Sequence, residues 1–290
     1  MNLLELFALA AIWGASFLFM RVATPEFGPV ALIALRVGIA ALVLAPVLQS
    51  ADARRQFRSK LRPLFIVGVT NSAVPFCLFA YSTLYVDAGF DSILNATTPL
   101  WAALIAALGF QLAMKRDQVI GLTFGLLGVV VLAWDKVTAG TSDVPLAVGA
   151  VLLATALYGF AINYSKRHLA GVTPFVVAFG SQFFASIVLL PLALFFWPQH
   201  AIAPSSWACV AALGVFCTGL AYILFFRLIE HAGAAYAASV TFLIPIFGVI
   251  WGVIYLEEKI TPMVIVGCTI IFFGTALASG KLKGILPRKA

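Results

Sequence analysis

The chain has 290 residues, of which 63% are hydrophobic and only 10% are charged, and its mean hydropathy is +1.07. This composition excludes an ordinary soluble protein, because too few polar residues are present to cover a water-facing surface. The formal net charge of +7 does not call for a nucleic-acid partner, since basic loops beside anionic lipid headgroups give the same excess.

The sequence predicts an all-α integral membrane protein with ten spanning helices. A helix needs about 20 apolar residues to cross the hydrocarbon core of a bilayer. The first segment carries Glu5 and lacks a basic start, so we expect a retained spanning helix rather than a secretory signal. In chain order the segments cover residues 3–22, 29–49, 63–85, 91–113, 119–135, 146–166, 174–196, 205–227, 233–255 and 262–280.

Landmarks of the first half recur in the second half at an offset of 145 or 146 residues. This predicts two five-helix repeats, residues 1–137 and 145–290, in one integrated membrane domain. Because five is an odd number, the second repeat enters the bilayer from the opposite side. Inverted repeats around a central cavity are the architecture of secondary transporters. The matching residues are Trp13 with Tyr158, Pro29 with Pro174, Pro99 with Pro245, Gly121 with Gly267 and Gly128 with Gly274.

The distribution of Lys and Arg predicts the orientation in the membrane. One set of loops holds basic residues at 54–62, 115–116, 166–167, 227 and 281–289. The opposite set holds only Arg21, Lys136 and Lys259. Because basic loops stay on the cytoplasmic side, we expect both termini in the cytoplasm.

The first helix carries an aromatic stripe. Trp13, Phe17 and Met20 follow at spacings of four and three residues, and the sixth segment offers Tyr158 and Asn163 at a similar depth. These rings either face lipid and neighbouring helices or line a binding site. Trp13 lies near the middle of its helix, whereas belt tryptophans lie at the headgroups, so we favour a substrate-binding face.

The fourth and ninth segments share small polar side chains beside a proline. Proline frees a backbone carbonyl, which hydroxyls, neighbouring helices or water can satisfy in a membrane helix. These positions are either inert kinks or the binding depth and bending points of an alternating-access carrier, and we favour the second interpretation. The predicted binding residues are Asn95, Thr98, Trp101, Ser239, Thr241 and Phe242, and the predicted hinges are Pro99 and Pro245.

Arg36 is the one formal charge inside a predicted span, and it lies about 10 Å from the outer end of the second helix. Its guanidinium either extends outward to Glu26, Asp87 or Asp91, or forms a cavity wall or outward gate that meets a carboxylate substrate. In the third segment, Phe79 lies near mid-membrane and joins the predicted binding residues.

No Asp, Glu or His falls near the middle of a predicted span, and no catalytic or metal-binding motif is present. We therefore expect no enzyme activity, no metal and no cofactor. The remaining possibilities for energy coupling are a facilitator driven by the substrate gradient and a proton route through acids near the loops. In the fifth segment, Gly121 and Gly125 have the spacing that lets membrane helices approach closely, as packing struts or as a dimer contact, so the oligomeric state stays open.

Taken together, these residues resemble the drug/metabolite transporter superfamily, in its ten-helix EamA branch. The resemblance implies two inverted repeats around a substrate cavity in a bacterial inner membrane, and export of small metabolites. Within the branch the chain is similar to aromatic amino-acid exporters of the YddG type, although Lys115-Arg116-Asp117 stands where many members have a Gly-Glu pair. The resemblance rests on Trp13-Gly14-Ala15-Ser16-Phe17, Arg36, the run from Ala88-Gly89 to Trp101, and the run from Ala232-Gly233 to Phe247 with Leu256-Glu257-Glu258.

The residues and the resemblance agree on a substrate that is an amphiphilic zwitterion with an apolar or aromatic side chain. The rings accept that side chain, and neutral hydrogen bonds from Asn95, Thr98, Asn163, Ser239 and Thr241 bind its polar groups. The alternatives are a multidrug or nucleotide-sugar carrier of the same fold, and a membrane channel.

Overall fold

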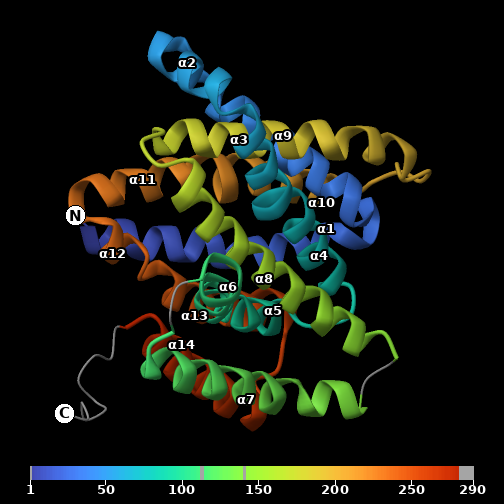
Figure 1. Cartoon of the computed structure of the whole chain (residues 1–290). Helices are drawn as coiled ribbons and strands as arrows, with labels where there is room; N and C mark the ends of the chain where they lie inside the picture. Colours follow the sequence, from blue (N-terminus) through green and yellow to red (C-terminus); the bar gives the residue numbers. More distant parts are fainter. Residues whose placement is uncertain (1, 112–113, 140–141, 281–290) are drawn as a thin grey trace, which may run out of the picture.

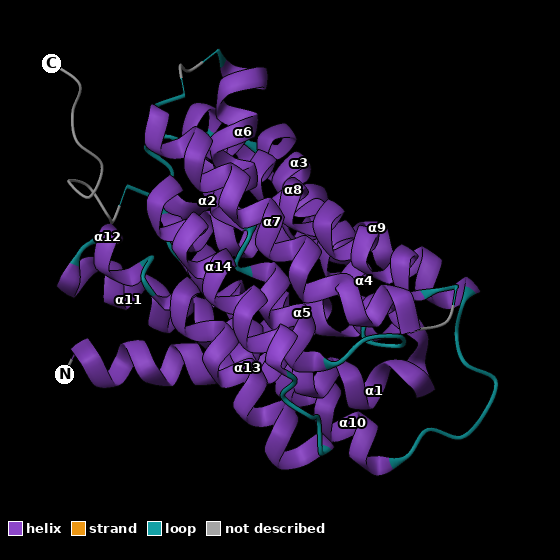
Figure 2. Ribbon diagram, turned by 90° about the horizontal axis from the view of Figure 1, so that it is seen from below, coloured by secondary structure: helices purple, strands orange, loops and turns teal. Residues whose placement is uncertain are grey.

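The computed structural model describes residues 2–111, 114–139 and 142–280, and every regular element in these ranges is helical (Figures 1 and 2). The predicted all-α membrane fold is confirmed in this part of the chain. The basic residues predicted at 281–289 lie outside it. In chain order the elements are α1 (Asn2–Leu44), η1 (Ala45–Gln49), α2 (Ala51–Ser59), α3 (Leu61–Gly68), η2 (Val69–Ala73), α4 (Val74–Ser82), α5 (Ala88–Asn95), α6 (Thr98–Phe110), α7 (Arg116–Ala139), α8 (Val144–His168), α9 (Pro174–Phe195), α10 (Pro204–Ala211), η3 (Ala212–Leu220), α11 (Ala221–Ala232), α12 (Ala234–Ala237), α13 (Val240–Leu256) and α14 (Pro262–Ala278).

Among the described residues, 7 helical stretches are long and apolar enough to cross a membrane, and Val240–Leu256 and Pro262–Ala278 are shorter apolar helices. The first stretch, Asn2–Gln49, contains both of the first two predicted segments, because α1 continues through a bend at Gly28. Gly28 has a φ of 71°, a conformation that glycine adopts without strain, and Pro29 follows it.

Helices α7 and α14 lie side by side along one edge of the molecule (Figure 1). A Cβ atom at Gly121 would stand 2.5 Å from the carbonyl oxygen of Gly274, and one at Gly128 would stand 3.1 Å from that of Gly267. The residue numbers rise along one helix as they fall along the other, so the two helices are antiparallel. The repeat offset converts one contact into the other, as an approximate two-fold axis requires. The glycines therefore pack two helices of one chain together, as the strut interpretation expects.

The repeat offset also relates two helix contacts near the centre of the molecule. A Cβ atom at Gly14 on α1 would stand 2.8 Å from Cβ of Phe247 on α13. One at Gly159 on α8 would stand 2.8 Å from the carbonyl carbon of Trp101 on α6. Each contact joins the first helix of one repeat to the fourth helix of the other, so the repeats interlock and share one buried apolar core.

Two π-helical segments interrupt the third and eighth spans. They are η2 and η3, and residues 69–73 of the first correspond to residues 215–219 inside the second. A π-helical turn changes the direction of the side chains beyond it, and such turns are frequent at functional sites. The structure therefore places an irregularity in the middle of both spans that the sequence did not signal.

The two prolines predicted as matched hinges occupy different local structures. Pro99 begins α6 after a break at residues 96–97, whereas Pro245 lies inside α13, and the second break falls earlier, at residues 238–239. At the first break, the carbonyl of Ala96 accepts a hydrogen bond from Thr275 Oγ1 at 3.0 Å, which satisfies a backbone group inside the apolar region. Each repeat therefore has a helix break in this region, but only Pro99 lies directly after its break.

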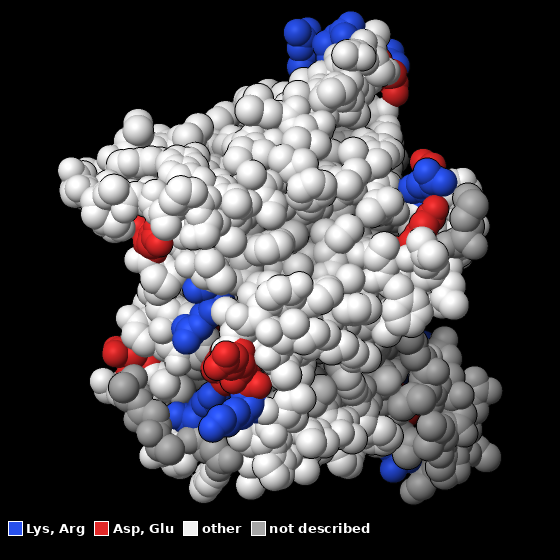
Figure 3. Space-filling model, turned by 180° about the vertical axis from the view of Figure 1, so that it is seen from behind, with Lys and Arg blue, Asp and Glu red and all other residues white. Residues whose placement is uncertain are grey.

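On the face shown in Figure 3, charged side chains form a few separate groups, and a large uncharged surface lies between them. This is the distribution that a membrane-spanning protein requires, because ionised groups are costly in the hydrocarbon core. In the part of the chain described, α12 lies at the same end of the molecule as the beginning of α1 (Figures 1 and 2). We call this the α12 end and the opposite one the α5 end.

Candidate functional site

Aromatic side chains from both repeats meet inside the helix assembly. Phe17 on α1 contacts Phe79 on α4, with ring centroids 5.6 Å apart, and Phe79 stacks on Tyr158 of α8 at 5.9 Å. Trp13 on α1 contacts Phe225 on α11 at 5.3 Å. These rings, together with Phe76 on α4, which contacts Tyr158 at 6.4 Å, form what we call the ring cluster.

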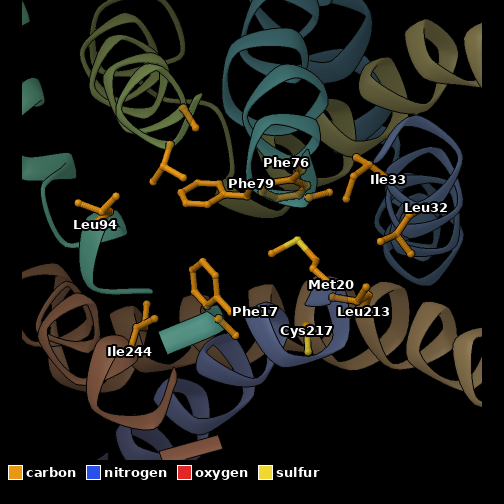
Figure 4. Packing of buried hydrophobic residues seen from close by; sticks show 14 of the residues in the cluster. Phe17, Met20, Leu32, Ile33, Phe76, Phe79, Leu94, Leu213, Cys217 and Ile244 are labelled. Carbon is orange, nitrogen blue, oxygen red and sulfur yellow. The ribbon is translucent and has the colours of Figure 1, made fainter. Parts of the chain in front are cut away.

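The ring cluster has the symmetry of the repeats. Trp13 corresponds to Tyr158 and Phe79 corresponds to Phe225, so the Trp13–Phe225 contact is the counterpart of the Tyr158–Phe79 contact. Each pair joins one repeat to the other. Figure 4 shows Phe17 of α1 directed toward Phe79 of α4 across the space between these helices. A ligand bound here would touch both repeats.

Arg36 lies beside the ring cluster and is only 4% exposed. Its guanidinium carbon stands 4.0 Å from the centroid of the Phe76 ring, a cation–π contact. Its Nε donates to Thr218 Oγ1 at 2.9 Å, and its Nη1 lies 3.6 Å from Met20 Sδ. The predicted binding residue Met20 thus contacts the buried guanidinium of Arg36.

Thr218 presents its oxygen to Arg36 because its own proton is used elsewhere. The hydroxyl donates to the carbonyl of Leu213 at 2.8 Å, five residues earlier in the π-helical η3. Its lone pairs are therefore free to accept from the guanidinium. The π-helical turn therefore orients the Thr218 hydroxyl so that it binds Nε of Arg36.

No carboxylate neutralises Arg36 in the described part of the chain, where none of the ion pairs within 4.0 Å includes it. The alternative in which Arg36 extends outward to an acid is wrong, because its side chain turns inward to α4 and η3. The three acids have other partners: Glu26 accepts from the Ala203 N–H at 2.6 Å, Asp87 pairs with Lys136, and Asp91 accepts from Ser82 at 2.8 Å.

The guanidinium retains N–H groups that no protein group accepts. Five N–H donors are available on an arginine, and the described hydrogen bonds use only Nε and one position on Nη1. Arg36 is absent from the described polar atoms that are both unpartnered and sealed from solvent. Nη2, which has no described partner, therefore keeps a small solvent-accessible area.

The second repeat provides a neutral counterpart to the Arg36–Thr218 hydrogen bond. Gln182 on α9 donates from Nε2 to Ser72 on η2 at 2.9 Å, and Ser72 corresponds to Thr218. Nearby, Asn71 donates to the Tyr222 hydroxyl at 3.5 Å. One half of the site is therefore cationic and the other half is neutral and polar.

Two of the predicted binding residues lie at the contact between α6 and α8. Asn163 donates from Nδ2 to the carbonyls of Ala102 and Gly159, each at 2.9 Å, so its amide ties these helices together. Trp101 packs its backbone against Gly159, and its indole N–H is sealed without a partner. No described contact joins either residue to the ring cluster.

The predicted small polar residues on the fourth and ninth helices bond mainly to their own backbone. The Thr98, Ser239 and Thr241 hydroxyls each donate to a carbonyl three residues earlier, at 2.8, 2.6 and 2.9 Å. Asn95 ends α5, and Phe242 contacts Phe272 on α14 with ring centroids 6.4 Å apart. These residues line the breaks in the helices, and their contact with a substrate stays a prediction.

The site also includes residues that were not predicted, namely Phe76, Thr218 and Tyr222. A usable signal was present in the repeat offset, because Tyr222 corresponds to Phe76 and Phe225 corresponds to the predicted Phe79. Thr218 could not be predicted as a site residue, because its contact with Arg36 depends on a π-helical turn and joins residues 182 positions apart in the sequence. Phe216 on η3 is 53% exposed and lies outside the ring cluster.

The α5 end of the molecule is closed by a charged network. Glu258 accepts the N–H groups of Ala88 at 2.6 Å and Gly89 at 2.9 Å, at the N-terminus of α5. Burial raises the pKa of Glu258 above the usual glutamate value, although these two hydrogen bonds oppose the shift. A cavity of about 620 Å³ lies outside this closure, lined by Arg21, Asp87, Lys136, Leu256, Glu257, Glu258, Lys259 and Thr261.

The segment at the α12 end is packed more loosely. A Cβ atom at Gly89 would meet Glu258 and Val249 at 3.2 Å, whereas one at Gly233, directly before α12, would meet nothing within 4 Å. In addition, every residue from 88 to 94 is buried on α5, but Ala234 on α12 is exposed. The structure is therefore tightly packed around α5 and more loosely packed around α12.

The comparisons with known proteins agree with this architecture. The profile of the EamA-like transporter family matches residues 2–134 and 145–280. The uncharacterized transporter YoaV of Bacillus subtilis is 21% identical, covering 94% of each chain. A probable terminal-alkyne amino-acid exporter of Streptantibioticus cattleyicolor is 24% identical over 94% of this chain and 91% of that protein. A solved crystal structure superposes with a TM-score of 0.66 over 96% of both chains at 18% identity, which shows the fold alone.

Proposed function

Because the chain belongs to the EamA-like transporter family, we propose that it exports small amphiphilic metabolites, amino acids with aromatic side chains included, by alternating access. The observation that carries this proposal is the ring cluster. It gathers aromatic faces from α1, α4, α8 and α11 inside the membrane-spanning region. Offset or edge-on contacts between aromatic rings are worth about 0.5–1.5 kcal/mol each beyond area burial, so a bound aromatic side chain gains from several neighbours.

The inverted relation of the two repeats supports alternating access. Inverted repeats take up each other's conformation when a carrier changes from one open side to the other. The tight contact of Gly89 on α5 with Val249 on α13, and the looser surroundings of α12, support a state that is closed at α5 and open at α12. The counterpart state has α12 closed and α5 open, and the ring cluster lies between these two gates in both states.

The direction of transport depends on the orientation, which we propose from the charge distribution. The basic helix α2, with Arg54, Arg55 and Arg58, follows the second predicted span and belongs to the same side as the N-terminus. On this basis the protein lies in a bacterial inner membrane with both termini in the cytoplasm. The open α12 end then faces the cytoplasm and admits the cargo for export.

A counterflow assay in proteoliposomes tests the proposal. Vesicles loaded with unlabelled phenylalanine and diluted into labelled phenylalanine should accumulate the label transiently above equilibrium, because a carrier exchanges one molecule for another. A channel gives no such overshoot. Overshoot with ethidium-type cations, but not with amino acids, would identify a multidrug carrier and contradict the proposal.

Among relatives, the Streptantibioticus protein is named as a probable terminal-alkyne amino-acid exporter. An alkyne side chain is apolar, and the zwitterionic backbone is shared with all amino acids. At 24% identity this supports the class of cargo that we propose, without specifying its side chain.

A further inference from the structure

The buried charge of Arg36 has no counter-ion among the residues that the structure describes. A guanidinium that is 4% exposed and has no anionic partner is unfavourable relative to one in water, even with one neutral acceptor at Thr218. A folded chain retains such a group most readily where another molecule supplies the missing charge. Nη2, which has no described acceptor, keeps a small accessible area, and an anion that pairs with Arg36 would bind on this side of the guanidinium.

The contacts of Arg36 leave one particular edge of the guanidinium available. Thr218 occupies Nε, and the Phe76 ring covers one face at 4.0 Å. Nη2 has no described acceptor, and Nη1 has only the Met20 sulfur at 3.6 Å, a weak acceptor. The open edge therefore presents Nη1 and Nη2 together, the pair that binds a carboxylate through two parallel hydrogen bonds.

The surroundings fit a carboxylate carried next to a ring. Phe76, under the guanidinium, contacts Tyr158, which stacks on Phe79. The Tyr222 hydroxyl accepts from Asn71, so its own proton is left free to donate. An amino acid with its carboxylate on Arg36 would lie next to these rings, because Phe76 contacts both the guanidinium and Tyr158.

We propose that Arg36 is the carboxylate-binding residue of the transport site, held by Thr218 and Phe76, so that the cargo must carry a carboxylate beside an apolar or aromatic group. This inference rests on the proposed function and specifies the chemistry of its site. Aromatic amino acids and arylalkanoic acids meet the requirement. Amines and carboxamides of the same shape leave the buried cation unpaired and are rejected.

Competition in the counterflow assay tests the inference. Labelled phenylalanine is competed with phenylalanine, 3-phenylpropionate, phenylalaninamide and phenethylamine, and the two carboxylates should inhibit at least about tenfold more strongly than the amide and the amine, given the strength of charge-assisted hydrogen bonds. Equal inhibition by all four compounds would overturn the inference. Absence of phenylalanine counterflow in the unmodified protein would instead count against the proposed function.

Variants give a readout that does not depend on transport. Arg36→Gln should be at least as heat-stable as the unmodified protein without ligand, because it removes an unpaired buried charge, and 3-phenylpropionate should no longer stabilise it. Arg36→Lys keeps the charge but loses the paired N–H groups, and should bind carboxylates roughly tenfold more weakly. Arg55→Gln is the matched control, since Arg55 is exposed, and it should behave as the unmodified protein.

Two outcomes would contradict the assignment of Arg36. One is retention of carboxylate-dependent stabilisation in Arg36→Gln. The other is equal stabilisation of the unmodified protein by chloride at the same concentration, which would identify a site for inorganic anions. Loss of stabilisation in Arg36→Gln, with Arg55→Gln unaffected, supports the inference.

Discussion

Replacing Gly121 by Ala tests the packing of α7 against α14. The new methyl group would stand 2.5 Å from the carbonyl oxygen of Gly274 and 2.6 Å from the amide nitrogen of Ala278. Both are backbone atoms, so no side chain can turn away, and the helices must separate. Overpacking of this kind costs about 1–3 kcal/mol, which lowers the unfolding midpoint by roughly 2–10 °C in a chain of this size.

The matched control is Gly149→Ala on α8, where the added methyl group meets nothing within 4 Å. Removing a helical glycine there should be neutral or stabilising by up to about 1 kcal/mol. Thermal unfolding of the two variants in the same detergent measures the difference. A midpoint for Gly121→Ala equal to that of Gly149→Ala would refute the close glycine contact and, with it, the two-fold arrangement of the repeats.

Three further predictions concern the site and its gates. Trp13→Ala should reduce the efflux of aromatic amino acids more than that of threonine, measured in the same vesicles, because it removes a ring of the cluster; equal loss would indicate a folding role. Asn163→Leu should lower the unfolding midpoint, because it removes the hydrogen bond from α8 to the Ala102 carbonyl on α6 and the one to the Gly159 carbonyl within α8, and an unchanged midpoint would argue against this tether. Burial raises the pKa of Glu258 above 4.5 in the folded protein, so folding favours the protonated carboxyl group. The free energy of unfolding should therefore decline as the pH rises from 4.5 through the raised pKa of Glu258. Glu258→Gln should flatten that part of the curve of unfolding midpoint against pH, and an unchanged slope would exclude Glu258 as the cause.

The repeat offset is the feature of the sequence that predicted most of the structure. It follows from residue types at fixed spacing, and the structure places Gly121 against Gly274 and Gly14 against Phe247 as the offset requires. Apolar length predicted the helices for the same reason, because spanning a bilayer sets a minimum length that can be counted. The bend at Gly28 falls between the first two predicted segments, one residue before the second begins at Pro29.

The details of the site were less predictable, because they depend on which distant residue a side chain meets. The sequence predicts that Asn163 binds the substrate, but its side-chain amide donates to two backbone carbonyls, those of Ala102 on α6 and Gly159 on α8. Arg36 reads as equally able to face an acid or a cavity, and only the π-helical turn at Thr218 decides between them. Neither a hydrogen-bond partner on another helix nor a local change of helical pitch has a signature in residue spacing.

Reciprocal accessibility of the two ends tests the central claim of alternating access most directly. Single cysteines replace Ser92 on α5, which is buried, or Ala234 on α12, which is exposed, in a chain with Cys77, Cys209, Cys217 and Cys268 changed to Ala. Labelling from each side of sealed vesicles should reach Ala234→Cys only from the cytoplasmic side in the absence of substrate. Saturating phenylalanine on the outer side should raise labelling of Ser92→Cys from that side and lower labelling of Ala234→Cys. Simultaneous labelling of both positions, or labelling that ignores the substrate, would contradict a carrier that opens one end at a time.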